Sequence, residues 1–173
     1  MTLGEGDFPT RMNAAYEYEA GDLLKEVILQ AKGENRITCG VYQVASKLNM
    51  NPKAVLLCLY ADDCVADDVL SMHFALIKAF CWENTVPLMK VSNHDALYEL
   101  LKDMRVVPPD FIQEGEDHED DFAIGESVAV TPEDTFCVLI EVPEHKSESE
   151  DELLHHHHNM AQCNPSPMAR LAS

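Results

Sequence analysis

Residues 54–61 read AVLLCLYA, an uninterrupted apolar run bounded by Pro52 and Asp62. The run is as long as an ordinary strand and shows no alternation between apolar and polar positions. These features predict a β-strand that is buried on both of its faces, as in a sheet packed between helices.

Helical patterns lie on both sides of this strand. Upstream, apolar residues recur at helical spacing in 20–32 and again in 41–49, with a short extended piece at 36–40 between them. Downstream, a helix is expected from about 67 to 83. Its apolar residues cover more than one face, so it needs cover from two sides.

The remaining regular segments complete an alternating order of strands and helices. We expect a strand at 86–91, a helix from residue 92 or 93 to about 104, and a last strand at 136–142. This order predicts an α/β fold, a three-layer α/β/α sandwich with a small mixed central sheet.

The chain divides by composition into three parts. Residues 1–13 are expected to form a flexible arm, and 14–142 a single domain with an acidic insertion at about 110–134. Residues 143–173 are acidic and contain a histidine run, which predicts a disordered tail.

The net charge of −19 is concentrated in one segment. Residues 110–152 carry 16 acidic residues against Lys146 alone, whereas 1–109 carry 15 acidic and 10 basic residues. Direct nucleic-acid binding needs a basic face, and none is visible, so basic protein partners are favoured. No apolar run approaches the roughly 20 residues that span a bilayer, which predicts no membrane association.

The sequence gives no pattern for catalysis, a cofactor or a metal. It contains neither a GxGxxG nor a GxxxxGK[ST] motif, and its six cysteines show no CxxC spacing. Cys39, Cys58, Cys81 and Cys137 have apolar neighbours and are expected to be buried thiols. Residues 155–158 are four adjacent histidines in a predicted tail, which could hold a metal only weakly and without geometry.

Four phrases together resemble the growth-arrest and DNA-damage-inducible (Gadd45-type) family. They are RITCGVYQVASKLN (36–49), AVLLCLYADD (54–63), MHFALIKAFCWEN (72–84) and MKVSN (89–93). The resemblance implies the α/β/α fold of kink-turn RNA-binding ribosomal proteins. It also implies a non-enzymatic stress-response adaptor of the nucleus and cytoplasm. The partners it implies are a MAP kinase kinase kinase, a mitotic cyclin-dependent kinase, the sliding clamp and DNA-repair or demethylation factors.

This sequence departs from the family pattern after its last predicted strand. Residues 144–159 read EHKSESEDELLHHHHN, where the family has a hydrophobic helix and a Trp-containing end. We therefore expect this helix to be missing.

A divergent kink-turn RNA-binding protein is the alternative that the fold implies. In the ribosomal relatives a glycine is followed by polar residues that reach the RNA, with a lysine one turn on. The matching stretch here is Gly40, Val41, Tyr42 and Gln43, with Lys47 beyond it. Apolar Val41 and bulky Tyr42 replace the polar readers, which disfavours this alternative.

An acidic loop after the first long strand is the best candidate contact patch. We expect its carboxylates to bind a basic docking surface on a protein kinase; they belong to Asp62, Asp63, Asp67 and Asp68. The alternative is a solvated loop that leads into a helix N-terminus.

The resemblance further implies a homodimer built on two helices. The candidate contacts, mapped from the family, are Val41, Val44, Leu48, Phe74, Ile77, Lys78 and Cys81. Separately, Ser147 and Ser149 each have a glutamate three residues on, a pattern that suits an acid-directed kinase. An unmodified, solvated tail is the alternative for these two serines.

Overall fold

The computed structural model describes residues 8–61, 68–102, 135–163 and 167–171. Within them the chain forms α1 (Phe8–Gly33), β1 (Ile37–Cys39), α2 (Val41–Met50), a 3₁₀ turn η1 (Pro52–Ala54), β2 (Val55–Tyr60), α3 (Asp68–Glu83), β3 (Leu88–Val91), α4 (His94–Leu101), β4 (Cys137–Glu141), α5 (Glu148–Cys163) and β5 (Met168–Ala169).

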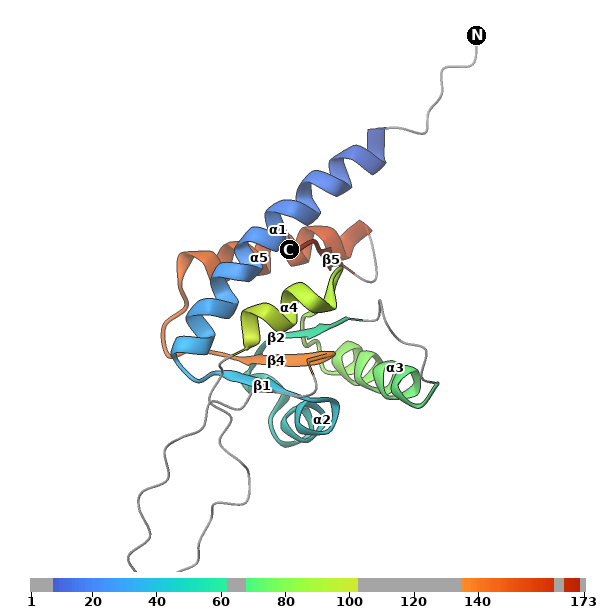
Figure 1. The fold of residues 1–173 in the computed structure, drawn as a ribbon, viewed down its shortest axis with the longest axis vertical. Coiled ribbons are helices and arrows are strands. Elements are labelled where there is room, and N and C mark those ends of the chain that lie inside the picture. The colour runs from blue at the N-terminus through green and yellow to red at the C-terminus, as the bar shows by residue number, and fades with distance from the viewer. Residues whose placement is uncertain (1–7, 62–67, 103–134, 164–166, 172–173) are drawn as a thin grey trace, which may run out of the picture.

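The strands form one mixed sheet in the order β1-β4-β2-β3-β5. β4 is antiparallel to both of its neighbours, β1 and β2, whereas β3 is parallel to β2 and β5 is parallel to β3. Helices α1, α4 and α5 cover one face of the sheet, and α2 and α3 cover the other (Figure 1). The predicted three-layer α/β/α sandwich with a mixed sheet is confirmed.

The apolar run at 54–61 forms the central part of this sandwich. All six residues of β2 are buried, as the pattern predicts. Leu57 and Leu59 face the core under α1, whereas Cys58 and Tyr60 face the core under α2 and α3. Because side chains alternate along a strand, one short apolar run contributes to both cores at once.

Helix α1 is longer than the sequence predicts. It begins at Phe8, so residues 8–13 are helical and the expected flexible arm is wrong for them. The apolar periodicity starts only near Ala20, which is the first buried residue from position 15 onward, where burial is described. Before that point the helix contacts α5, where the Tyr16 ring lies 6.0 Å from the His156 ring, a neighbour that the sequence did not predict.

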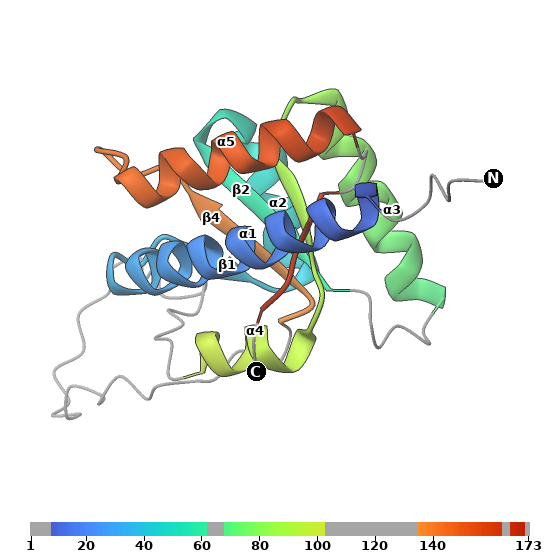
Figure 2. The same cartoon turned by 90° about the horizontal axis from the view of Figure 1, so that it is seen from above.

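The expected disordered tail is also wrong for the described residues beyond 142. Residues 148–163 form α5, which lies beside α1 on the same face of the sheet (Figure 2). Ser147 begins the helix with a capping box, since its Oγ accepts from the Glu150 N–H and its own N–H donates to Glu150 Oε2. Leu153 is fully buried in the core. A helix therefore does follow the last long strand, despite its charged sequence.

A buried carboxylate attaches α5 to the rest of the domain. Glu150 is completely buried and its Oε1 lies 2.7 Å from Nη2 of Arg36. The same guanidinium donates from Nη1 to the Glu141 carbonyl oxygen at 2.7 Å and from Nε to the Glu34 carboxylate. One arginine thus joins the end of α1, the end of β4 and the first turn of α5.

Candidate functional site

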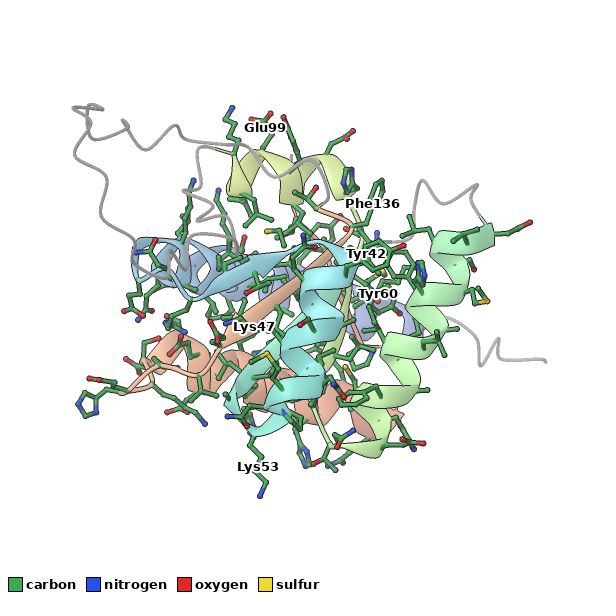
Figure 3. The ribbon with its side chains drawn as sticks, turned by 90° about the horizontal axis from the view of Figure 1, so that it is seen from below. Tyr42, Lys47, Lys53, Tyr60, Glu99 and Phe136 are labelled. Carbon is green, nitrogen blue, oxygen red and sulfur yellow. The ribbon has the colours of Figure 1, made fainter. Side chains whose placement is uncertain are left out.

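Helices α2 and α3 present a surface on the face of the sheet away from α1 (Figure 3). Six of the residues predicted as dimer contacts do not lie on it, because they are buried within one chain against the sheet: Val41, Val44, Leu48, Phe74, Ile77 and Cys81. We expected these side chains to form an exposed stripe, but both helices use them to cover the sheet, and a role in contacts between two chains stays a prediction for them. Lys78 is half-buried, with Nζ 4.4 Å from the centre of the Tyr60 ring.

Large apolar side chains remain on the outside of the same two helices. We call them the outer α2–α3 face; they are Tyr42, Met50, Val69, Met72, Leu76 and Trp82. Trp82 is 78% exposed and Tyr42 is 73% exposed. Large exposed apolar side chains on a folded domain are candidates for contact with another molecule. The sequence signal for this face was the apolar character of α3 on more than one side.

Ring contacts connect the two helices at this surface. The rings of Tyr42 on α2 and His73 on α3 meet edge to face with centroids 5.3 Å apart. Beneath them, the Tyr60 ring on β2 lies 6.0 Å from the Phe74 ring. The outer face is thus carried by helices that contact each other as well as the sheet, which keeps its side chains in a defined arrangement.

The predicted acidic patch falls mainly outside the described residues. Asp62, Asp63 and Asp67 lie there, so their place in the patch stays a prediction. Asp68 is the first residue of α3 and is exposed. Its carboxylate lies at a helix N-terminus, where negative charge is favourable.

The stretch that matches the RNA readers of ribosomal proteins begins at a glycine with a positive φ. Gly40 has φ 101° and precedes α2, a conformation that favours glycine. Val41 is turned into the core, whereas Tyr42 and Gln43 are exposed. Lys47 Nζ lies 3.1 Å from Glu141 Oε1, so the one basic residue of this stretch is paired with a carboxylate.

The two candidate phosphorylation sites lie at the start of α5. Ser147 is the capping residue described above, and Ser149 is half-buried in the first turn. The S-x-x-E spacing of Ser147 and Glu150 is a capping-box signal in the sequence, and it indicates a helix start that the acidic composition of the segment does not.

The cysteine thiols under α3 form part of the core. Cys58, Cys81 and Cys137 are buried and free, as predicted, whereas Cys39 is only half-buried. Hydrogen bonds with the Cys137 and Cys81 thiols, together with burial, raise the pKa of the Cys58 thiol well above its ordinary value. Cys58 is therefore held as an unreactive thiol.

The histidine run is a regular part of α5. His155 and His158 are exposed, whereas His156 and His157 are half-buried. His157 Nε2 lies 2.9 Å from the Leu88 carbonyl oxygen, and desolvation lowers the pKa of its imidazole. Among the described residues, no three His, Cys, Asp or Glu side chains are placed to hold a metal ion together. Within the same residues, no helix is long and apolar enough to cross a membrane.

Comparison with known proteins agrees with this architecture. Residues 22–121 match the model of the "Ribosomal protein L7Ae/L30e/S12e/Gadd45 family". The chain is 40% identical over 138 residues to the growth arrest and DNA damage-inducible protein GADD45 alpha of Rattus norvegicus, which covers 78% of this chain and 73% of the rat protein. It is 46% identical over 85 residues to GADD45 alpha of Homo sapiens, covering 48% of this chain and 52% of the human protein.

A second branch of relatives shows the same resemblance. GADD45 gamma of Mus musculus is 38% identical over 97 residues, which cover 54% of this chain and 61% of the mouse protein. The match to the family model and the identity to the rat protein both extend over most of the folded domain. This chain therefore belongs to the L7Ae/L30e/S12e/Gadd45 family and is one of its growth-arrest and DNA-damage-inducible proteins.

Proposed function

We propose that this protein is a non-enzymatic stress-response adaptor that binds and modulates protein kinases of the MAP kinase kinase kinase and cell-cycle classes. The proposal places it in growth arrest, apoptosis and DNA-damage signalling, in both the nucleus and the cytoplasm. The observation that carries it is the outer α2–α3 face, where Trp82 and Leu76 are exposed on a helix that is already anchored to the sheet. The names of the relatives, growth arrest and DNA damage-inducible proteins, support the same setting.

Charge supports a basic partner surface. The chain carries −19, and Asp62, Asp63 and Asp67 come just before α3 in the sequence, with Asp68 as its first residue. A basic patch on the partner would bind these acidic residues, while apolar side chains of the partner would pack against the outer α2–α3 face. Charge complementarity of this kind raises association rates, and buried apolar anchors then slow dissociation. The adaptor changes kinase activity by the difference between its affinities for the active and inactive states.

A homodimer through the same helices is part of the proposal. Its contacts are the outer residues Met72, Leu76 and Tyr42, in place of the buried set named from the sequence. A twofold interface repeats each contact, so a few apolar residues on one face are used twice. The dimer and the kinase would then compete for, or share, one surface.

Purified components test the proposal. The full chain and a Trp82→Ala, Leu76→Ala variant are compared for binding to a purified MAP kinase kinase kinase by surface plasmon resonance. We expect about a tenfold or larger loss of affinity for the variant, as for interface anchors of this type. Tyr98→Ala on α4, an exposed aromatic residue on the opposite layer, is the matched control. Equal binding by all three proteins would remove the outer face from the proposal.

The kink-turn alternative is tested on the same samples. Retention on a structured kink-turn RNA that falls steeply with salt would favour it, because phosphate contacts release counterions. Phosphate contacts are disfavoured here, because Lys47 is paired with Glu141 and Val41 is buried.

A further inference from the structure

The last described segment, 167–171, lies along the free edge of β3. The Lys90 N–H donates to the Pro167 carbonyl oxygen at 2.8 Å, and the Ser92 N–H donates to the Ala169 carbonyl oxygen at 3.1 Å. Within the described part of the chain, these bonds make β5 a parallel strand with two paired positions on β3. The segment is joined to the sheet by backbone groups that every extended chain possesses.

Helix α1 holds the other side of the same segment. The Arg170 N–H donates to the Glu17 carbonyl oxygen at 2.9 Å, and Arg170 Nε donates to Glu17 Oε2 at 2.6 Å. One turn further along α1, a Cβ built on Gly21 would lie 1.8 Å from the Arg170 carbonyl oxygen. Only a glycine at this position allows the backbone of the segment to pass this close to the helix.

Side chains of the segment fill defined positions. Ala169 is fully buried and Leu171 is almost so, and both belong to the same apolar cluster as Ala20 and Val91. The Arg170 side chain is 42% exposed and lies at the rim, with its guanidinium carbon 5.8 Å from the centre of the Tyr18 ring. The segment thus presents a small apolar residue, an arginine and an aliphatic residue in succession. Strand-addition sites read partner peptides in this way, by backbone bonds and alternate side-chain positions.

We propose that the β3 edge and the 17–21 turn of α1 form a peptide-binding site that residues 167–171 fill as an internal ligand. A partner protein's extended segment with the same order, small apolar residue, arginine and aliphatic residue, exchanges with it. The two-position pairing of β5, against five paired positions between β2 and β4, makes the internal segment the readily released part of the sheet. The site goes beyond the proposed kinase binding, because it lies on α1 and β3 rather than on the outer α2–α3 face.

A peptide exchange experiment tests the site. A fluorescein-labelled peptide of residues 164–173 (NPSPMARLAS) is titrated by fluorescence anisotropy with the full chain and with a full-chain Ala169→Asp variant. The substitution puts a charge into the buried position of the internal segment only. We expect the variant to bind the peptide about tenfold or more tightly than the unaltered chain, because its site is no longer occupied in cis.

Matched controls assign the binding to this site. Adding Gly21→Ala to the Ala169→Asp variant should abolish peptide binding, because the new methyl group occupies the path of the peptide backbone. A peptide with Arg170→Glu should bind at least about tenfold more weakly, and Glu17→Arg in the protein should restore it. A folded Ala169→Asp variant that does not bind the peptide overturns the proposal. A concentration-dependent dimer of the unaltered chain that Ala169→Asp abolishes also overturns it, since the segment would then be exchanged between two copies.

Hydrogen exchange on the unaltered chain decides the matter even if Ala169→Asp does not fold. The amides of Lys90, Ser92 and Arg170 are bonded within this contact, whereas that of Ala61 is bonded to the Phe136 carbonyl oxygen at the end of the central β2–β4 pair. We expect the first three to exchange about 100-fold or more faster than Ala61, through an opening that leaves the domain folded. Equal protection at all four positions would show that the segment opens only with the whole domain, and the proposal would be wrong.

Discussion

Arg36 and Glu150 form an ion pair across 114 positions of sequence, with Nη2 and Oε1 2.7 Å apart and the carboxylate fully buried. Replacing Glu150 by Ala leaves a buried guanidinium without its inner partner and should destabilise the domain by about 3–5 kcal/mol. Urea unfolding followed by circular dichroism measures the change. The double variant Arg36→Met, Glu150→Leu should lose clearly less than the two single variants combined. Glu148→Ala, an exposed first-turn control, should change stability by less than about 0.5 kcal/mol.

The capping box at the start of α5 gives a second prediction. Ser147→Ala removes the acceptor for the Glu150 N–H and should cost about 0.5–2 kcal/mol of stability. Ser149→Ala, two residues on and free of this role, is the matched control in the same urea titration. If both substitutions are neutral, the helix start does not depend on Ser147.

Phosphorylation of Ser147 and Ser149 stays a prediction, and the structure suggests which serine is modified faster. Modifying Ser147 requires its Oγ to leave the Glu150 N–H, whereas Ser149 has no such bond to Glu150. An acid-directed kinase should therefore modify Ser149 faster in the folded protein, with the difference lost in a synthetic peptide of 143–154. Time-resolved mass spectrometry gives the two rates, and equal rates in the folded chain would contradict the prediction.

The free energy of unfolding should fall as the pH is lowered, in part because His157 becomes protonated. Burial lowers the pKa of its imidazole below the ordinary value of 6.5, so the unfolded state binds the proton more strongly than the folded state. The stabilising contribution of neutral His157 is therefore complete above pH 6.5 and is lost as pH falls towards the lowered pKa. Urea unfolding at several pH values should show a shallower acid loss for His157→Gln than for His158→Gln, its exposed neighbour. If the stability of the two variants changes with pH in the same way, His157 does not cause the loss of stability in acid.

Two adjacent residues of α3 distinguish the proposed dimer interface from the core. Leu76 is 63% exposed and Ile77 is 5% exposed. Leu76→Glu should leave the fold and its stability nearly unchanged and give a monomer in sedimentation equilibrium. Ile77→Glu should unfold the domain, because it buries an unpaired charge. A Leu76→Glu protein that sediments like the unaltered chain as a dimer would show that the dimer uses another surface.

The acidic residues Asp62 and Asp63 give a prediction about the rate of association with a kinase. Asp62→Lys with Asp63→Lys should slow association with a basic kinase surface and flatten its salt dependence, with little effect on dissociation. Stopped-flow or surface plasmon resonance at several salt concentrations provides the rates. Deleting 112–126 is the comparison, since this segment carries more charge. If the deletion abolishes kinase binding and the lysine variant binds normally, the wrong acidic segment has been chosen.

Local patterns predicted the sheet and its cover well. The apolar run at 54–61 and the helical spacing at 41–49 depend on neighbours in sequence, and both elements form as expected. The sequence could not show in the same way which side of α3 faces the sheet and which faces solvent. Apolar residues surround this helix, and whether Leu76 or Ile77 faces the sheet depends on how the helix packs.

The C-terminal elements were missed for a different reason. Their sequence is polar, and charge alone argued for disorder. Leu153 and Glu150 of α5 are both buried, and the partner of Glu150, Arg36, lies 114 positions away and gives no local signal. Only the capping residue Ser147 could have indicated the helix start from sequence.

The position of β4 has a consequence for how the chain folds. β4 lies between β1 and β2, yet it is separated from both by α3, β3 and α4 along the chain. During synthesis, β1 therefore has no partner strand until residues 137–141 leave the ribosome, and β2 exposes one unpaired edge for the same period. Folding rate should depend on this late, long-range pairing. The nascent chain before that point is the form of this protein most exposed to aggregation and to capture by chaperones.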